Sequence, residues 1–324
     1  MKRLIDKKYL VLIIVFIVLP FLVPSSYVRN LLVLAGIFAL LALSTDLVLG
    51  YIGQLTLGQS AFFGVGAYAS AIIAKELGIP FWISIIGAIV IAGVLGYFIG
   101  FISLRLRGGY FAITTLAFAQ IMKLIANNWI ELTRGPMGYT KIPSPSIFGL
   151  EIKSEIPYYF LTFIFVVLII IIIKRLIDSP TGRAYLAIRE QEDLARAVGI
   201  DVFRHKVQAF VISAMIAGLA GGLYAHYFRF ISPDLLGIQY TSMALMMVFV
   251  GGRGSIPGVL IGAGIYTVLP ETLRMAGTLR MSIFGVILLL CIMFMPGGIY
   301  RSIAGWIKRK SKKNGNIVQQ TTVS

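Results

Sequence analysis

Charged residues are scarce in this chain. Asp, Glu, Lys and Arg make up 13% of its 324 residues, whereas hydrophobic residues make up 58%. A soluble domain of this length needs many more polar residues to cover its surface, so the composition excludes that class. The apolar runs are continuous and long enough to span a bilayer, and they do not alternate as barrel strands do. The sequence therefore predicts an all-α integral membrane protein, because helices satisfy their own backbone hydrogen bonds in lipid.

Residues that carry chemistry are equally few. Two histidines, His205 and His226, and one cysteine, Cys291, provide neither an internal disulfide nor a metal-ligand cluster. The glycine cluster at 251–254 lacks the Lys-Ser/Thr pair of a phosphate-binding loop. We expect no catalysis, no cofactor and no metal. Apart from Asp46, the apolar runs have no carboxylate at their centres, which argues against a proton- or sodium-driven carrier.

Ten apolar runs predict about ten transmembrane helices. They cover residues 9–23, 29–49, 51–74, 81–104, 109–127, 157–174, 207–227, 238–251, 258–274 and 282–299. Glycines in the third run and the short length of the eighth predict broken or re-entrant helices there. We expect the first run to be retained as a helix, because no small-residue cleavage pattern follows it. His226, beside two tyrosines, is expected to anchor its helix at the membrane interface.

The net charge of +16 follows this topology and does not indicate a nucleic-acid partner. With ten crossings and a cytoplasmic N-terminus, most of the 29 Lys and Arg residues fall on the cytoplasmic side, where both termini then lie. The expected divisions are residues 1–177 with spans one to six and a large external loop at 128–156, residues 178–206 as a cytoplasmic element, residues 207–300 with spans seven to ten, and residues 301–324 as a basic, disordered tail.

Residues 178–200 form the one long polar, helix-forming stretch between the two hydrophobic blocks. Ser179 and Pro180 predict a capped helix start. A helical pattern then runs to Val198, and Gly199 predicts its end. The residues alone allow two interpretations, a solvated linker or a docking element for a soluble partner. Its charged side chains are Arg183, Arg189, Glu190, Glu192, Asp193 and Arg196.

Polar residues and glycines interrupt the third and fifth expected spans. Polar side chains at membrane depth are costly unless they face a cavity or another helix. Glycines let the backbone unwind toward a polar solute. We therefore favour a solute path over interhelical hydrogen bonding alone. The candidate path residues are Gln54, Thr56, Gln59, Ser60, Thr114, Thr115 and Gln120.

Other glycines lie four residues apart within expected spans. This spacing lets two helix backbones approach closely, and we expect it to serve packing. The pairs are Gly96 and Gly100, Gly218 and Gly222, and Gly258 and Gly262.

An ordered series of segments resembles the membrane permease of branched-chain amino acid ABC transporters, of the LivM type. The resemblance covers about residues 30–300. No single segment is specific, but the whole series in order is. The segments are GQLTLGQSAFFGVGAYASA (53–71), LRLRGGYFAITTLAFAQI (104–121), SPTGRAYLAIREQEDLARAVGI (179–200), AFVISAMIAGLAGGLYAHY (209–227), ISPD (231–234), MVFVGGRGSIPGVLIGA (247–263) and MPGG (295–298). The sequence departs from the family at 133–136, where the family more often has two glycines.

The resemblance implies a permease without a catalytic site, in a bacterial or archaeal inner membrane. It would import leucine, isoleucine, valine or related hydrophobic amino acids by alternating access. The implied partners are a second permease of the LivH type, two ABC ATPase subunits, an extracytoplasmic solute-binding protein and membrane lipid. Residues 179–200 become the ATPase-coupling region, with Leu194 at a position where the family usually has alanine. The residues assigned to coupling are Arg183, Arg189, Glu190, Glu192, Leu194, Ala195 and Gly199.

Three other functions stay open at this point. The same architecture serves permeases for urea, short amides or other small solutes, because the binding protein largely sets the substrate. A second is an ion-coupled carrier that works alone. The third is a membrane enzyme acting on lipids, which the lack of a catalytic constellation disfavours.

Overall fold

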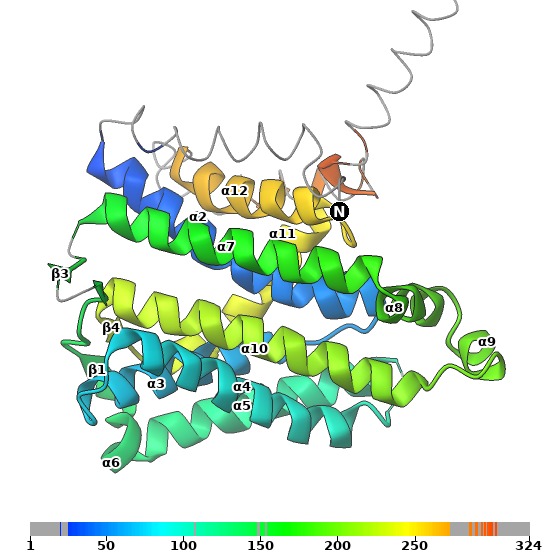
Figure 1. The fold of residues 1–324 in the computed structure, drawn as a ribbon, viewed down its shortest axis with the longest axis horizontal. Helices are drawn as coiled ribbons and strands as arrows, with labels where there is room; N and C mark the ends of the chain where they lie inside the picture. The colour runs from blue at the N-terminus through cyan, green and yellow to red at the C-terminus, as the bar shows by residue number, and fades with distance from the viewer. Residues whose placement is uncertain are drawn as a thin grey trace, which may run out of the picture.

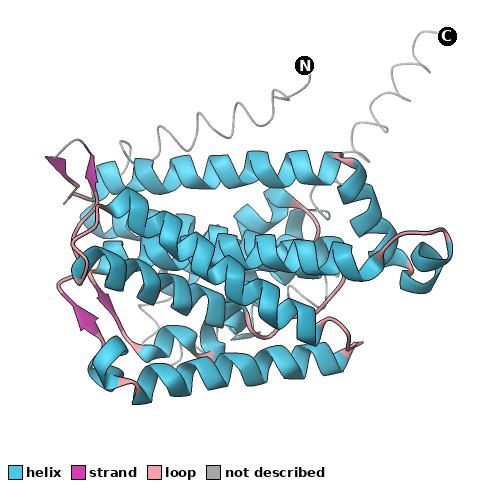
Figure 2. Ribbon diagram, turned by 60° about the horizontal axis from the view of Figure 1, so that its bottom comes forward, coloured by secondary structure: helices cyan, strands magenta, loops and turns pink. Residues whose placement is uncertain are grey.

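The long helices run side by side along one axis and are connected at the two ends (Figure 1). This computed structural model describes residues 20, 25–106, 108–147, 150–152 and 154–272, with residues 285, 286, 289, 290, 293, 295, 297–300 and 302. Short strands lie at one end, which we call the strand end (residues 129–154 and 229–237). The opposite α9 end (residues 179–201) carries two short helices that project beyond the bundle (Figures 1 and 2).

Helices account for most of the described chain because the apolar runs satisfy their backbone polar groups internally. The first half contains α2 (Ser26–Asp46), which continues as a π-helix, η1 (Leu47–Ile52), then α3 (Gln59–Lys75), α4 (Phe81–Ser103), α5 (Gly109–Asn128), α6 (Ile130–Thr133) and the 3₁₀ turn η2 (Gly135–Met137). The second half contains α7 (Glu155–Asp178), α8 (Pro180–Glu190), α9 (Glu192–Ala197), α10 (Val202–Phe228), the 3₁₀ turn η3 (Pro233–Leu236), α11 (Ile238–Gly251) and α12 (Ile256–Thr272).

Four two-residue strands close the strand end. They are β1 (Tyr139–Thr140), β2 (Ser146–Ile147), β3 (Leu150–Glu151) and β4 (Phe230–Ile231). β1 pairs antiparallel with β4, and β2 pairs antiparallel with β3. The β1–β4 pair ties the loop before α7 to the end of α10. The all-α prediction missed these ribbons, which are too short for an alternating pattern to reveal.

Five helices in the described part are long and apolar enough to cross a membrane: Ser26–Ile52, Phe81–Ser103, Gly109–Asn128, Glu155–Asp178 and Val202–Phe228. They confirm the runs expected at 29–49, 81–104, 109–127, 157–174 and 207–227. The runs at 238–251 and 258–274 form the shorter apolar helices α11 and α12. The run expected at 9–23 lies outside the described residues apart from residue 20, and most of 282–299 lies outside them too.

The third expected span, 51–74, is wrong as one continuous helix. The helix that begins with α2 ends at Ile52, residues 53–58 are irregular, and α3 starts only at Gln59. Gly53 adopts a left-handed conformation with φ 81°, which L side chains rarely take and which ends the first helix. The broken helix that the glycines predict is present at this place.

Helix α10 lies at the centre of the bundle, packed along α3 and α4 and also against α2. Glycines make the close approach possible. A Cβ on Gly218 would lie 2.5 Å from the Ala92 Cβ, and one on Gly100 would lie 2.9 Å from the Phe210 ring. These contacts confirm that the spaced glycines serve helix packing.

Candidate functional site

The polar segment between α7 and α10 folds as two helices. The Ser179 Oγ accepts a hydrogen bond from the Gly182 N–H at 3.4 Å and caps α8. Gln191 is extended, with φ −158° and ψ 99°, so α9 is a separate helix. The helical pattern expected up to Val198 is thus present as two helices that are separated at Gln191. Gly199, with φ 89°, does lie just beyond the end of α9, as predicted.

Helix α8 is fixed to the bundle through its apolar side. Tyr185 and Ile188 are buried, and the Tyr185 ring meets the His205 ring edge-on at 6.1 Å between centroids. Burial raises the pKa of the Tyr185 phenol. These bulky side chains fix α8 against the start of α10.

Three of the seven predicted coupling residues face the protein and four face outward. Arg189 and Glu192 are half-buried and Ala195 is buried, so these three face the protein. The outward-facing group consists of Arg183, Glu190, Leu194 and Gly199. Val198, which is not among the predicted residues, is 70% exposed, and Leu194 is 58% exposed. Spacing of i, i+4 alone predicts that these two apolar side chains share one face.

Glu192 holds α9 against α10. Its Oε2 accepts a hydrogen bond from the Lys206 Nζ at 2.6 Å, and the Lys206 side chain is only 2% exposed. Arg196 adds a second contact to the same carboxylate at 3.3 Å. Lys206 is a functional-site residue that we did not predict. The helical period could have identified it, because Lys206 lies four residues after the buried Val202, on the face of α10 that is turned inward.

Arg189 reaches from α8 to the end of η1. Its Nη1 donates a hydrogen bond to the Gly50 carbonyl oxygen at 2.7 Å. Its Nη2 donates to the Glu190 Oε1 at 2.7 Å. This hydrogen bond and the guanidinium charge hold the pKa of the Glu190 carboxyl below its ordinary value. Arg189 thus connects the polar element with the broken helix.

The irregular segment 53–58 runs back beside the last turns of α2, the first of the five membrane-spanning candidates. The Gln59 Nε2, at the start of α3, donates to the Ser44 Oγ at 2.9 Å and to the Ser213 Oγ at 2.5 Å. Ser44 lies about two helical turns before the end of η1, so residues 53–58 return into the protein before α3 begins. Non-helical backbone at this depth is tolerated where it is enclosed by protein or lines a water-filled cavity.

Four of the predicted path residues are buried and hydrogen-bonded to neighbouring elements or nearby backbone. The Thr115 Oγ1 accepts from the Leu57 N–H at 3.0 Å, and the Ser60 Oγ donates to the Leu236 carbonyl oxygen at 3.1 Å. The Thr56 Oγ1 accepts a hydrogen bond from the Gly58 N–H at 3.3 Å, just before α3. The Oε1 of Gln59 is buried and has no hydrogen-bond partner among the described residues. One strong acceptor is therefore left over in the centre of this cluster.

The other three path candidates lie nearer the surface. Gln54 is half-buried, Thr114 is half-buried with its Oγ1 bonded to the Tyr110 carbonyl oxygen at 2.9 Å, and Gln120 is exposed. The structure thus separates the predicted set into an internal cluster and residues near the surface of α5 and the 53–58 segment.

The connection at the strand end is anchored and is not a loose loop. Arg134 and Gly135 both have a left-handed backbone, with φ 64° and 58°. This explains why glycines suit these positions. Arg134 forms an ion pair with Glu76 at 3.3 Å. The same Glu76 carboxylate accepts from the Tyr139 hydroxyl at 3.2 Å, and burial raises the pKa of Tyr139.

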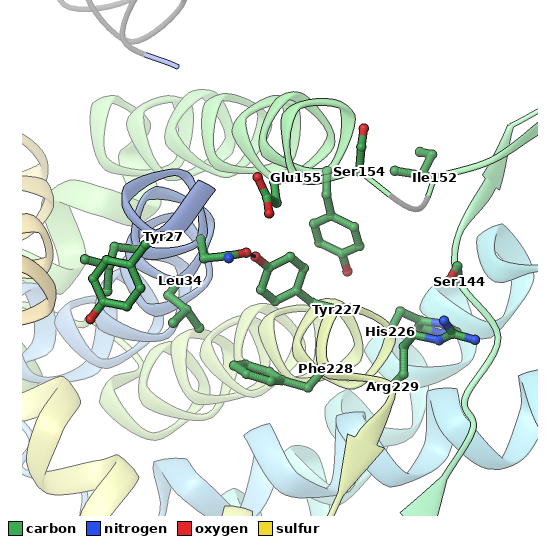
Figure 3. A pocket seen from close by; sticks show the side chains of 13 residues that line it. Tyr27, Leu34, Ser144, Ile152, Ser154, Glu155, His226, Tyr227, Phe228 and Arg229 are labelled. Atoms are coloured by element: carbon green, nitrogen blue, oxygen red, sulfur yellow. Dashed lines mark hydrogen bonds between the residues drawn. The ribbon is translucent and has the colours of Figure 1, made fainter. Parts of the chain in front are cut away.

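A cavity of about 650 Å³ opens at the strand end between α2, α7 and α10 (Figure 3). The carboxylate of Glu155 and the guanidinium of Arg229 lie at different parts of its wall, with Tyr27, Tyr158 and Tyr227. None of the predicted path residues lines it. Within the described residues, no group of three or more His, Cys, Asp or Glu side chains could hold a metal ion.

His226 also lies beside this cavity, but it is not the interfacial anchor that we expected. Its side chain is buried, at 1% exposure. One ring nitrogen lies 2.9 Å from the Ser70 Oγ and the other 2.7 Å from the Pro143 carbonyl oxygen. The imidazole instead connects α3, α10 and the loop before β2.

These features define a class. The chain is a multi-pass membrane protein: five described helices are long and apolar enough to cross a bilayer, a broken helix with buried polar groups lies among them, and a folded polar element projects from one end.

The family follows from sequence comparison. The family model for the branched-chain amino acid transport system / permease component matches residues 27–296, and the chain belongs to this family. It is 32% identical to the high-affinity branched-chain amino acid transport system permease protein LivM of Salmonella typhimurium, over 93% of this chain and 76% of the relative. LivM of Escherichia coli is 33% identical, over 94% of this chain and 77% of the relative.

A second kind of permease matches as well. The LivH permease of Salmonella typhimurium is 28% identical, over 83% of this chain and 93% of the relative. These relatives are transport permease subunits and not enzymes. No solved structure matches the chain significantly.

Proposed function

We propose that this chain is one of the two permease subunits of an ATP-driven importer of leucine, isoleucine, valine or related hydrophobic amino acids. The observation that carries the proposal is the match to branched-chain amino acid permeases along nearly the whole chain. The partners are a LivH-type permease, two ABC ATPases and an extracytoplasmic solute-binding protein. The chain supplies the gate, and the ATPases supply the energy.

Charge supports an orientation with the α9 end in the cytoplasm. The helix ends and loops on that side carry nine of the described Lys and Arg residues: Arg105, Lys174, Arg175, Arg183, Arg189, Arg196, Arg204, Lys206 and Arg253. The side of the strand end carries six: Arg29, Lys75, Lys123, Arg134, Lys141 and Arg229. An excess of Lys and Arg on one side marks the cytoplasmic face. Both termini of the chain then lie in the cytoplasm.

In this orientation α8 and α9 form the ATPase-coupling element. Helix α9 projects beyond the ends of the spanning helices (Figure 1). It carries Leu194, and Val198 follows its last residue, so water and not lipid would surround these two exposed side chains. Two exposed apolar side chains that share one face of a projecting helix suit contact with a protein partner. The outward charges of Arg183 and Glu190 would flank the docked ATPase, whereas Glu192 holds the element in shape.

The complete importer tests this assignment. We expect proteoliposomes that contain this chain, its LivH-type partner and both ATPases to accumulate leucine when ATP and the binding protein are supplied. Omitting the ATPases should abolish accumulation, because this chain has no nucleotide-binding motif. Uptake by the chain alone on a sodium or proton gradient would contradict the proposal. Uptake of urea or short amides in place of leucine would show that the chain belongs to a permease for small polar solutes and not for amino acids.

The solute path is proposed to pass the 53–58 break and the start of α3, toward α5. The leftover Gln59 Oε1 supports this, because a buried acceptor suits the ammonium group of an amino acid once α3 and α5 separate. In the conformation described here the cluster is closed, so Gln59 and Ser60 hold the helices together. Alternating access would exchange these internal hydrogen bonds for contacts with the solute.

A Gln59→Leu variant is expected to lower the apparent affinity for leucine about tenfold to a hundredfold. This is the range for losing one hydrogen bond to a charged group, about 1.5–3 kcal/mol. The measurement is the concentration dependence of uptake in assembled complexes. Gln208→Leu is the matched control, because that side chain is exposed on the same central helix α10 that Gln59 contacts. Unchanged affinity in Gln59→Leu would remove Gln59 from the path.

A further inference from the structure

Three backbone segments that are far apart in the sequence meet at one point inside the α9 end. They are the π-helical turn η1, the loop 252–255 between α11 and α12, and the last turn of α8. The Gly254 N–H donates to the Asp46 Oδ1 at 2.7 Å, and Arg189 donates to the Gly50 carbonyl oxygen at 2.7 Å. We call the four residues Asp46, Gly50, Arg189 and Gly254 the clasp.

The clasp leaves no room for a side chain at its centre. A Cβ on Gly50 would collide with both the Asp46 carboxylate and the Gly254 nitrogen. A Cβ on Gly254 would lie 3.0 Å from the Arg189 Nη1, and one on Gly53 would lie 2.9 Å from the Arg189 Cγ. Arg189 is therefore packed against two segments at once. Asp46 is 1% exposed and lies within the described core.

Arg189 is less accessible to a soluble partner than its neighbour on α8. Its side chain is 28% exposed, compared with 73% for the neighbouring Glu190. An ATPase docked on the outer side of α8 would touch Glu190 and Arg183 first. The guanidinium instead ends on the carbonyl of a π-helical turn, a feature that is often found at functional sites.

We infer that Arg189 is a positioning residue that transmits the movement of α8 to the broken helix, through the clasp. The inference rests on the proposed function, since it requires an ATPase that moves α8. When α8 shifts, the Arg189–Gly50 hydrogen bond pulls on η1, and the loop 252–255 follows because Asp46 holds its backbone. The 53–58 break starts three residues after Gly50, so the pull reaches the segment where the path is proposed to open.

A π-helical turn suits this role because such turns are local irregularities within α-helices that occur frequently at functional sites. The adjoining left-handed Gly53 can take up a change in backbone angles without a side-chain clash. Small movements are thus converted into rearrangement of one short segment, while α8 and α10 stay rigid.

The complete importer, assembled in proteoliposomes, tests the clasp through the ratio of leucine transported to ATP hydrolysed. Arg189→Met is expected to keep the ATPase subunits bound and ATP hydrolysis active, but to lower this ratio at least tenfold. Gly50→Ala should uncouple in the same way, although residue 50 is out of reach of an ATPase. Arg204→Met, at an exposed arginine in the first turn of α10 that belongs neither to the clasp nor to the coupling residues, should leave the ratio unchanged.

The conservative variant separates coupling from folding. Arg189→Lys keeps a donor for the Gly50 carbonyl and should restore part of the lost ratio, since lysine offers one compact charge in place of a planar fork. Loss of the ATPases from either Arg189 variant would show a docking residue and overturn the inference. An unchanged ratio in Arg189→Met would overturn it as well. Failure of the unmodified complex to use ATP for uptake would instead refute the proposed function.

Discussion

Replacing Gly221 with alanine is expected to leave almost no folded protein after extraction into detergent. Gly221 lies in α10 at its crossing with α3. An added Cβ would collide with the Phe63 carbonyl oxygen and would lie 2.9 Å from the Ala67 nitrogen. Both obstacles are backbone atoms of a packed helix, so neither can rotate away. Overpacking in cores costs about 1–3 kcal/mol where side chains can yield, and we expect more than about 4 kcal/mol here.

Size-exclusion chromatography and thermal unfolding of the purified protein measure this effect. Gly264→Ala in α12 is the matched control, because a Cβ there meets nothing within 4 Å. That variant should be as stable as the unmodified protein or gain about 0.5–1 kcal/mol, the usual benefit of alanine over glycine within a helix. A monodisperse Gly221→Ala protein with an unchanged unfolding temperature would show that the α3–α10 crossing is looser than described.

Helix packing of this kind could be predicted in part. Spacing of i, i+4 identified Gly218 and Gly222 as contact positions. Gly221 and Gly66 do not form such a pair with each other, yet they lie at the tightest crossing, against Phe63 and Gly218. Which glycine meets which backbone depends on the rotation of each helix about its axis. A single sequence does not carry that information for helices that are apolar on nearly every side.

The positions of the spanning helices were easier to predict than the break at 53–58. Long apolar runs located five spanning helices to within a few residues, because hydrophobic length is a direct requirement of the bilayer. The break at 53–58 was indicated by its glycines, but not the depth at which α3 begins. That depth is set by side-chain contacts such as Gln59 with Ser44 and Ser213, which only the tertiary structure brings together.

For the candidate coupling residues, the sequence likewise predicted the location of the element but not which of its side chains are buried. Charge density and the Ser179 cap identified the element, and the resemblance supplied its role. The sequence did not reveal that Arg189 and Glu192 face inward, since both sit among charged residues that look equally exposed. Lys206 and His226 are buried because they find partners, Glu192 for one and Ser70 for the other. Partners that are distant in the sequence, more than residue type, decide whether a polar side chain is buried.

Introducing aspartate at both Leu194 and Val198 is expected to abolish leucine uptake and to release the ATPases from the complex. Burying the two exposed side chains in a partner groove is worth about 1.5–3 kcal/mol for each. A carboxylate in the same place would leave an unpaired charge in the interface. Together these effects predict a loss of affinity of at least a hundredfold. Co-purification with a tagged ATPase, followed by uptake measurements, gives both results.

Met137→Asp provides the control at the opposite end of the molecule. Met137 is 85% exposed at the strand end, so the substitution adds the same charge at an equally accessible apolar position. If the α9 end faces the cytoplasm, Met137→Asp should retain both ATPases while the Leu194/Val198 variant loses them. The reverse outcome would place the ATPases at the strand end. The Glu192–Lys206 ion pair holds α9 against α10, so we expect α9 to stay folded in the double variant. ATPases that bind more weakly but are not released would then mean that the charged residues of α8 make most of the contact.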